Sequence, residues 1–97
     1  MNGADLIKQE RIRQISVEGW TPEHDEQWIH GELIHAAAAY LLNTLKLAYR
    51  WLWPWDESWF KPSRDDTIRD LVKAGALIAA EIDRRQRAGT AVSEETS

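Results

Sequence analysis

Four of the six tryptophans in this chain lie between residues 51 and 59, and their type and spacing point most directly to chemistry. The segment from Trp51 to Pro62, here called the Trp loop, reads WLWPWDESWFKP. It cannot continue as a helix, because Pro54 disfavours helical geometry at Trp53 and removes a backbone donor. Exposed tryptophan clusters mark binding surfaces, and a stacked nucleobase contributes ~1–3 kcal/mol in single-stranded nucleic acid complexes. The loop therefore predicts a stacking surface for a flat ligand such as a nucleobase.

Cationic side chains beside the Trp loop could bind the phosphate of such a ligand. Lys61, Arg64 and Arg69 follow the last tryptophans, and Lys73 lies one helical turn after Arg69. Three aspartates stand three or four residues from Arg69 or Lys73, so ion pairing within the helix is the alternative; they are Asp65, Asp66 and Asp70. Two residues of an earlier turn complete the predicted ligand-binding set, which is Trp20, His24, Trp53, Trp55, Trp59, Lys61, Arg69 and Lys73.

The same rings also have a purely structural interpretation. A chain of 97 residues builds a small core, so the Trp loop could fold back and fill that core with indoles. The two interpretations are compatible, because some rings can be buried while one or two remain in a pocket wall.

A second polar cluster, EGWTPEHDE from Glu18 to Glu26, precedes and begins the next predicted helix. Its carboxylates and His24 could hold a hard divalent cation together with Glu32 and His35. Acidic residues are, however, favoured at a helix N-terminus without any metal. The chain also has no cysteine, no Gly-rich phosphate loop, no nucleophile elbow and no zinc motif. We therefore predict no catalytic residue, no metal and no cofactor.

Composition limits the class of protein further. The chain is 43% hydrophobic and 29% charged, which is typical of one globular domain. Its net charge of -4 argues against non-specific attraction to nucleic acid or to an anionic membrane. The lack of cysteine, of an apolar signal segment and of a long apolar run predicts a cytoplasmic protein without a membrane span. The small core favours a homo-oligomer.

Three helices, and no strand, are predicted to position these side chains. The first covers about residues 5–18, with Leu6, Ile7, Ile12 and Ile15 facing inward and Lys8, Glu10, Arg11 and Arg13 on a solvated face. The second starts at Thr21 and Pro22 and runs for about thirty residues to Pro54, with Gly31 as the point where it could bend. Its Ala36 to Ala39 run would let another helix approach closely.

The third helix starts at Ser63 or Asp65 and stops at Gly89. The predicted fold is therefore all-α, with three helices, a long central helix and the Trp loop between the second and third. Residues 1–89 form the domain, and residues 90–97 form a disordered tail.

The quoted motifs carry a resemblance to a known group of proteins. EGWTPEHD from Glu18, WPWDESWFKP from Trp53 and RDLVKAGALIAAEI from Arg69 look like the motifs of a family of short, uncharacterised phage and prophage proteins. The resemblance covers most of the chain from Glu10 to Arg87 and departs at Trp28, where relatives are expected to have His. It implies a phage-borne accessory protein that acts in the infected bacterial cytoplasm.

Two fainter likenesses suggest activities. Gly19-Trp20, the Lys61-Pro62 loop and the segment from Asp66 to Gly75 are similar in outline to the ryanodine-receptor repeat domain, some bacterial versions of which are thought to bind nucleotide-like ligands. The segment from Gly31 to Ala39 with Glu81 resembles the all-α MazG-type nucleotide pyrophosphohydrolases. The carboxylate pairs of those enzymes are incomplete here, since His35 follows Glu32 and Arg84 follows Glu81.

The leading hypothesis is a non-enzymatic phage protein that captures a small nucleotide-type ligand, such as a host defence signal, in a pocket lined by the Trp loop. The alternatives are an inhibitor or adaptor that docks the Trp loop on a host protein, since Trp and Arg dominate interface hot spots, and a MazG-like pyrophosphohydrolase.

Overall fold

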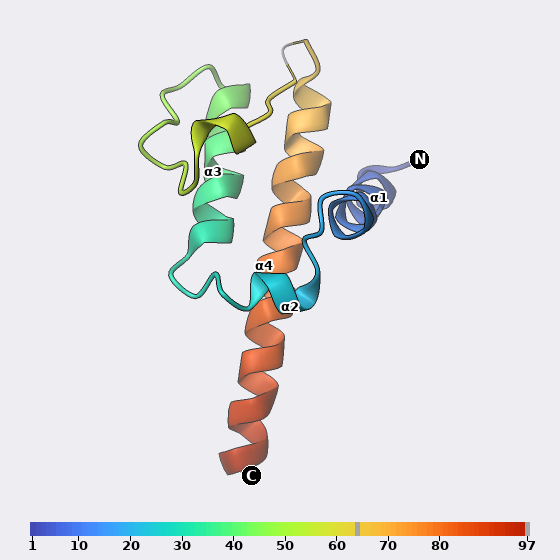
Figure 1. Ribbon diagram of the computed structural model, residues 1–97. Coiled ribbons are helices and arrows are strands. Elements are labelled where there is room, and N and C mark those ends of the chain that lie inside the picture. The colour runs from blue at the N-terminus through green and yellow to red at the C-terminus, as the bar shows by residue number, and fades with distance from the viewer. Residues whose placement is uncertain (64, 97) are drawn as a thin grey trace.

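The computed structural model describes residues 1–63 and 65–96, with side chains to residue 89. Every regular element in this part of the chain is helical, which confirms the all-α prediction. In chain order the elements are α1 (Gly3–Ser16), α2 (Pro22–Asp25), α3 (Glu32–Thr44), the 3-10 turn η1 (Glu57–Trp59) and α4 (Thr67–Thr96). Figure 1 shows α3 and α4 side by side and antiparallel, with α1 crossing at a steep angle beside α4.

A capping box starts α1, and a glycine of α4 lets it pack closely on that helix. Its N-terminus has a capping box, in which Asp5 N donates to Asn2 Oδ1 at 2.9 Å and Asn2 N donates to Asp5 Oδ2 at 3.2 Å. The helix lies close against α4 because Gly75 has no side chain there. A Cβ atom at Gly75 would lie 2.6 Å from Ile7 Cδ1, so this glycine sets the approach of the two helices.

The predicted long second helix is wrong, because the chain from Thr21 to Pro54 forms two separate helices and part of a loop. Thr21 caps α2 as predicted, with its Oγ1 accepting from His24 N at 3.2 Å and Pro22 in the first turn. α2 ends after four residues. Gly31 then adopts a φ of +83° at the start of α3, a left-handed conformation that no helix can run through.

α3 also ends at Thr44, well before Pro54. Lys46 adopts a φ of +58°, and its N donates to Asn43 O at 3.0 Å while Leu47 N donates to Leu42 O at 2.9 Å. This pair of bonds is a Schellman motif, with lysine at the position that glycine usually occupies. No glycine or proline follows Thr44 directly, so the sequence does not indicate that α3 ends there. The prediction from the spacing of apolar residues therefore made this helix too long.

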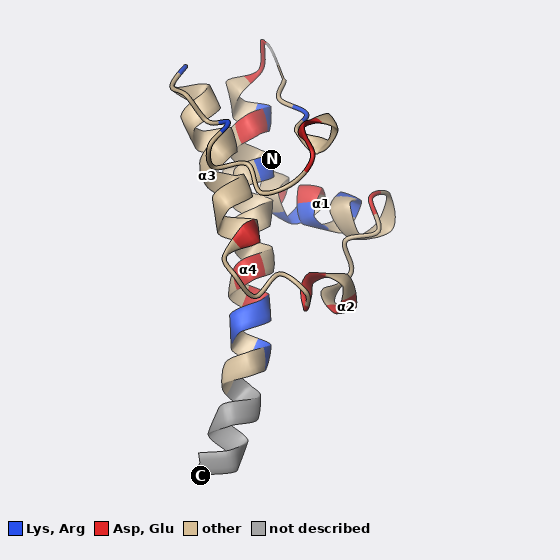
Figure 2. Cartoon of the chain, turned by 60° about the vertical axis from the view of Figure 1, so that its left-hand side comes forward, with Lys and Arg blue, Asp and Glu red and all other residues tan. Residues whose placement is uncertain are grey.

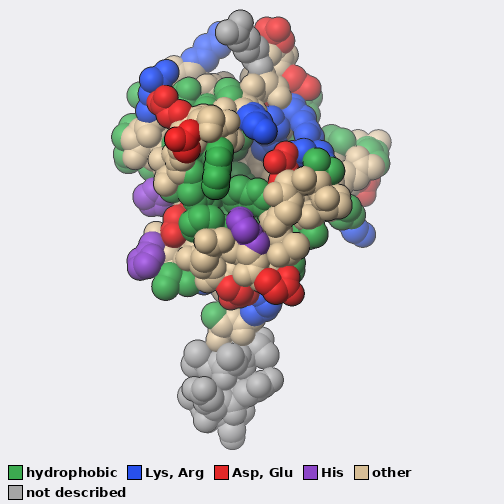
Figure 3. Space-filling model, viewed as in Figure 1, with side chains coloured by type: hydrophobic (Ala, Val, Ile, Leu, Met, Phe, Trp, Pro, Cys, Tyr) green, Lys and Arg blue, Asp and Glu red, His purple; other side chains and the backbone are tan. Residues whose placement is uncertain are grey.

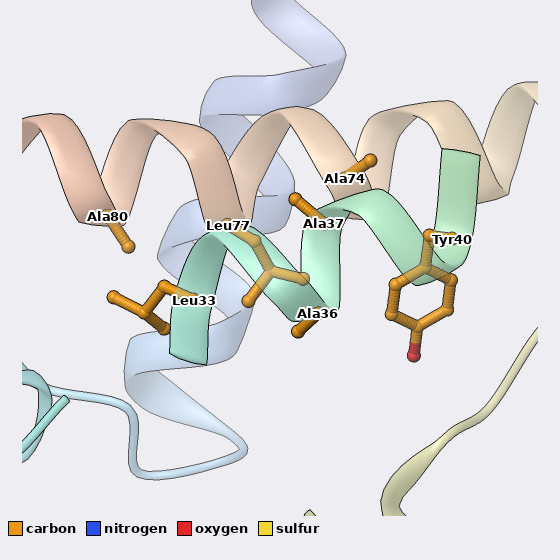
Figure 4. Close-up of a cluster of buried hydrophobic side chains, with 7 residues drawn as sticks. All are labelled: Leu33, Ala36, Ala37, Tyr40, Ala74, Leu77 and Ala80. Atoms are coloured by element: carbon orange, nitrogen blue, oxygen red, sulfur yellow. The ribbon is translucent and has the colours of Figure 1, made fainter. Parts of the chain in front are cut away.

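The contact between α3 and α4 is built largely from alanine. The buried cluster drawn in Figure 4 consists of Leu33, Ala36, Ala37, Tyr40, Ala74, Leu77 and Ala80. Small side chains let the helix backbones approach closely, as the run of alanines predicts. Alanine side chains also bury little apolar surface, so this core needs further apolar side chains from other segments of the chain.

These further apolar side chains come from the Trp loop and from the turns on either side of α2. The aromatic side chains packed against the buried cluster are Trp20, Trp28, Trp53, Trp55 and Phe60. For Trp53, Trp55 and Phe60 of the Trp loop the structural interpretation is therefore confirmed. These partly buried rings cover a core that is itself built by α3 and α4.

Polar groups on both helices hold the end of the Trp loop in place. Tyr40 Oη accepts from Lys61 N at 3.2 Å. Asp70 Oδ1 accepts from Ser63 N at 2.8 Å, and Asp70 Oδ2 accepts from Asn43 Nδ2 at 3.4 Å. Asp70 is only 1% exposed, so this one carboxylate joins α4, the C-terminal end of α3 and the end of the loop inside the protein.

α4 has the bounds Thr67–Thr96, so Gly89 does not end it as predicted. The predicted disordered tail, residues 90–97, lies outside the part of the chain whose side chains are described. Among the described residues no helix has both the length and the apolar character needed to cross a membrane.

Asp70→Ala tests whether this carboxylate anchors the loop. We expect the free energy of unfolding to fall by about 1–3 kcal/mol, because the substitution leaves the partly buried Ser63 N–H without its acceptor. Urea denaturation followed by tryptophan fluorescence measures the change. Asp65→Ala removes an exposed carboxylate from the same junction and should leave stability close to that of the wild type. Equal stability of the two variants would contradict the anchoring role.

Candidate functional site

One cleft collects every residue of the predicted ligand-binding set. It has a volume of about 490 Å³ and lies between the Trp loop, α1 and α4, on the side of the molecule shown in Figure 3. The predicted residues that line it are Trp20, His24, Trp53, Trp55, Trp59, Lys61, Arg69 and Lys73. Seven lining residues were not predicted: Glu10, Arg13, Gln14, Glu18, Tyr40, Ser58 and Leu77.

One wall of the cleft is aromatic. Trp55 lies at its centre, with ring centroids 4.9 Å from Trp20, 5.3 Å from Trp53 and 6.2 Å from Trp59. The contacts are edge-on or tilted, which is the favoured geometry for aromatic pairs. Trp20, Trp53 and Trp55 are half-buried, whereas Trp59 is 50% exposed. Trp59 is therefore the ring of this wall that is most open to a stacking partner.

Trp51 lies apart from this wall. It does not line the cleft, and it is 75% exposed. The Trp loop thus divides its four indoles between a packed group that borders the cleft and one ring that faces solvent. Trp51 consequently provides a matched control for the function of the others.

The opposite wall is polar and comes largely from α1. Glu10 is 2% exposed and Gln14 8% exposed, so the prediction that Glu10 is solvated is wrong, as is the prediction that Ile12, at 55% exposed, faces inward. The reason is ion pairing: Glu10 Oε1 lies 2.8 Å from Arg13 Nε and 2.7 Å from Arg69 Nη2. Glu10 therefore joins α1 to α4 at the edge of the cleft.

The protonation state of Glu10 follows from these contacts. Burial by itself raises the pKa of a carboxylic acid. Here the hydrogen bond from Arg13 and the charge of Arg69 outweigh burial, and the pKa of Glu10 lies below its ordinary value of 4.5. The hydrogen bond to Glu10 also raises the pKa of Arg13. At neutral pH both members of the Glu10–Arg13 pair are therefore charged.

Lys61 and Lys73 lie where the two walls meet. Lys73 Nζ donates to Lys61 O at 2.5 Å and lies 5.8 Å from the centroid of the Tyr40 ring. Burial lowers the pKa of Lys73, since the charged amine has lost part of its hydration. A partly desolvated ammonium attracts an anion more strongly than an exposed one.

The expected pairing of Arg69 and Lys73 with aspartates of their own helix is wrong. Arg69 pairs with Glu10 of α1, and Lys73 bonds to the loop backbone. The aspartates of this region instead accept hydrogen bonds from backbone N–H groups. Asp66 Oδ1 accepts from Arg69 N at 3.0 Å, and Asp70 Oδ1 accepts from Ser63 N. Arg64, the other predicted cation, lies outside the described residues.

The cleft is locally positive in an acidic protein. Its lining includes the cationic side chains of Arg13, Lys61, Arg69 and Lys73 against the carboxylates of Glu10 and Glu18. The whole chain carries a net charge of -4. An anionic ligand is consequently attracted to this cleft rather than to the surface in general.

The carboxylates of the acidic turn, residues Glu18 to Glu26, do not converge on one point. Three of its carboxylates each pair with a different arginine: Glu18 with Arg13 at 3.0 Å, Asp25 with Arg11 at 2.9 Å and Glu26 with Arg87 at 2.6 Å. Among the described residues no group of three or more His, Asp or Glu side chains is placed to hold a metal ion. Electrostatic and structural roles account for these acids.

His24 keeps its predicted place in the cleft wall. Its Nδ1 lies 3.4 Å from Oδ1 of Asp25, and its ring centroid is 5.1 Å from that of Trp20. Asp25 is fully buried and also accepts from Arg11, so it is a fixed support for the imidazole. A rigidly held imidazole can donate to or accept from a bound ligand.

Gln14 and Tyr40 are the informative residues that sequence reasoning missed. Gln14 Nε2 donates to Glu10 Oε2 at 3.3 Å, while its buried Oε1 has no partner among the described residues. Gln14 lines the cleft, but this oxygen is itself closed off from solvent. Its position four residues after Glu10 was the available signal, since residues at this spacing share one side of a helix.

Comparison of the chain with protein-family models, with curated proteins and with solved structures finds no match. The chemistry of the cleft is therefore argued from its own residues.

Acid titration tests the contribution of Glu10. Because its pKa is lower in the folded chain than in the unfolded chain, its stabilising effect is complete above about pH 4.5 and is lost as the pH falls through the folded pKa. We expect Glu10→Gln to reduce the free energy of unfolding at pH 7 by about 1–3 kcal/mol and to flatten its decline with acid. Denaturant titrations at several pH values measure both effects.

In Glu10→Gln the free energy of unfolding should still decline with acid to some extent, because Glu81 is a second buried carboxylate. The hydrogen bond from Arg84 lowers the pKa of Glu81, so this second buried carboxylate retains its own acid-dependent loss in the variant. Glu57→Gln is the control, because Glu57 and its partner Arg50 are both exposed. An unchanged acid profile in Glu10→Gln would contradict the role assigned to Glu10.

Proposed function

We propose that this protein is a non-enzymatic binding module that captures a small nucleotide-type ligand in the cleft. One observation carries the proposal: a single cleft of about 490 Å³ is lined both by indoles and by four cationic side chains. A nucleotide has the same division, with a flat base at one end and anionic phosphate at the other. Ligand cavities in proteins commonly measure roughly 300–1,000 Å³, so the size supports a mononucleotide or a compact dinucleotide.

Each part of the ligand has a group to meet it. The half-exposed Trp59 would stack on the base. Lys73 and Lys61 would bind the phosphate as point charges. His24 would contact ribose or phosphate from the far end of the aromatic wall.

The carboxylates argue for binding without hydrolysis. In the MazG-like alternative, Glu32 and Glu81 would belong to magnesium-binding pairs. Glu32 Oε1 instead accepts from His30 N at 2.7 Å, and Glu81 pairs with Arg84 at 2.6 Å and Arg85 at 3.0 Å. These contacts support a structural role for both.

The biological setting is proposed from the motifs alone. The likeness to short phage and prophage proteins suggests capture in the cytoplasm of an infected or lysogenic bacterium. The ligand would then be a nucleotide signal of the host's defence against phage, which the protein withdraws by binding it.

Tryptophan fluorescence tests the proposal with AMP, ADP-ribose and cyclic di-AMP as probes. We expect saturable quenching by at least one of them, because a base stacked on Trp59 perturbs the emission of the aromatic wall. Trp59→Ala should weaken binding about 10- to 100-fold, which corresponds to the loss of one stacking contact. Isothermal titration calorimetry measures the same affinities without relying on the indole signal.

Trp51→Ala is the matched control, since it removes an exposed indole from the same loop without touching the cleft. It should bind the probes like the wild type. No saturable binding of any probe would overturn the proposal. Binding that depends on Trp51 and not on Trp59 would also contradict it and would favour the alternative in which the loop docks on a host protein.

Lys73→Met tests the phosphate subsite. We expect the affinity for AMP to fall about 10- to 100-fold, as for the loss of a charged hydrogen bond, with little change in the affinity for adenosine. The ratio of the two affinities reports on the phosphate contact and not on general loss of structure. Lys8→Met removes an exposed lysine of α1 and should leave the ratio unchanged. An equal loss for AMP and adenosine would show that Lys73 does not bind phosphate.

A further inference from the structure

A second pocket adjoins the cleft and shares three residues with it. This pocket, here called the α1–α4 pocket, has a volume of about 350 Å³ and is lined by residues of α1 and of the first turns of α4. Glu10, Arg13 and Arg69 line both the cleft and the α1–α4 pocket. Figure 2 shows that α1 carries residues of both charge signs where it lies beside α4. The ion pairs of Glu10 therefore form a border between two neighbouring pockets.

Arg69 stands on this border. A helical turn of about 100° per residue places Arg69 about 40° from Lys73, which lines the cleft, and about 60° in the other direction from Val72, which lines the α1–α4 pocket. The side chain of Arg69 is 36% exposed. Its Nη2 pairs with Glu10 Oε1 at 2.7 Å, and among the described residues its Nε and Nη1 have no partner. Arg69 can therefore donate to a ligand that extends from one pocket into the other.

The charge of Arg69 is available to such a ligand, whereas the charge of Arg13 is used within α1 and the turn after it. Arg13 donates to both oxygens of Glu10, at 2.8 and 2.9 Å, and to Glu18 Oε1 at 3.0 Å. This bidentate pair compensates Glu10 independently of Arg69. Arg69 and Lys73 are four residues apart on α4, and like charges at this spacing repel each other. An anionic group bound between these two cations removes that repulsion.

The other walls of the α1–α4 pocket suit an uncharged group. Three aliphatic side chains, Leu6, Ile68 and Val72, line it together with Gln9 and Asp66. Among its described lining residues, the cations are the two arginines that it shares with the cleft. A nucleoside fits this lining, because its base can pack on the aliphatic side chains and hydrogen-bond to the Gln9 amide, and its ribose hydroxyls can donate to Asp66. A terminal polyphosphate would instead meet the Asp66 carboxylate.

We propose that the ligand of this protein is a dinucleotide, with one nucleotide in the cleft, its phosphate linkage across Lys73 and Arg69, and the second nucleoside in the α1–α4 pocket. This inference rests on the proposed function, because it extends the nucleotide site of the cleft. The two volumes, about 490 and 350 Å³, each fall within the roughly 300–1,000 Å³ of ligand cavities.

Isothermal titration calorimetry with AMP, ADP and diadenosine diphosphate tests the inference. ADP adds a second phosphate to AMP, and diadenosine diphosphate adds a second adenosine to ADP. We expect diadenosine diphosphate to bind at least tenfold more tightly than ADP. The double variant Gln9→Ala/Ile68→Ala removes two exposed side chains of the α1–α4 pocket, so it should lower the affinity for diadenosine diphosphate about tenfold and leave that for AMP unchanged.

Ile12→Ala/Gln86→Ala is the matched control, because it removes the same two residue types at exposed positions outside both pockets. It should bind all three probes like the wild type. Equal affinities for ADP and diadenosine diphosphate would overturn this inference and leave the nucleotide site of the cleft standing. A preference for diadenosine diphosphate that the Gln9→Ala/Ile68→Ala variant retains would overturn it as well. No binding of any of the three probes would overturn the proposed function and this inference together.

Discussion

The structure depends on one constraint, which is that the contact between α3 and α4 is too poor in apolar volume to form a core alone. Four of its seven buried residues are alanines, so the helices lie close together and bury little side-chain surface. The chain compensates with Trp20, Trp28, Trp53, Trp55 and Phe60, which pack on this contact from the turns around α2 and from the Trp loop. The loop must therefore be held accurately, and the buried Asp70 together with Tyr40 does this. The aromatic wall of the cleft is the outer surface of that arrangement, so the stability of the fold and the shape of the site have the same cause.

The fold class, and the residues of the predicted set that line one cleft, could be predicted from the sequence because both depend on local signals. Proline, glycine and the spacing of apolar residues indicate where the helices and the loop lie. The number of tryptophans in the loop is higher than a connection between two helices requires, and this indicates a pocket wall. The extent of α3 could not be predicted, because its end depends on Lys46 in a left-handed conformation that lysine rarely adopts. The orientation of α1 could not be predicted either. Its buried Glu10 resembles a surface residue in sequence, and only the approach of Arg69 from α4, fifty-nine residues away, explains its burial.

Ion pairs in this protein define position more than they add stability. Buried charges gain from pairing but lose hydration, so a buried carboxylate such as Glu10 or Asp25 is weak evidence for a large stabilising term. What these pairs do is fix geometry. Glu10 sets the distance between α1 and α4, and Asp25 holds both Arg11 and His24. Three carboxylates of the acidic turn already have a cation, and within the described residues no group of acids is arranged for a metal. Lys73 instead donates to a backbone oxygen at the cleft.

The two sides of the α3–α4 pair therefore have different chemistry for a physical reason. On one side the helices are covered by indoles and crossed by α1, and the space left between these elements is the cleft. Elsewhere on the helix pair, Ile34, Leu41, Leu71 and Ile82 remain partly exposed to water at a cost in free energy. A small domain lowers that cost by burying such residues against another chain. The indoles lower the same cost on the cleft side, where they cover the thin contact between the two helices and form a wall of the cleft.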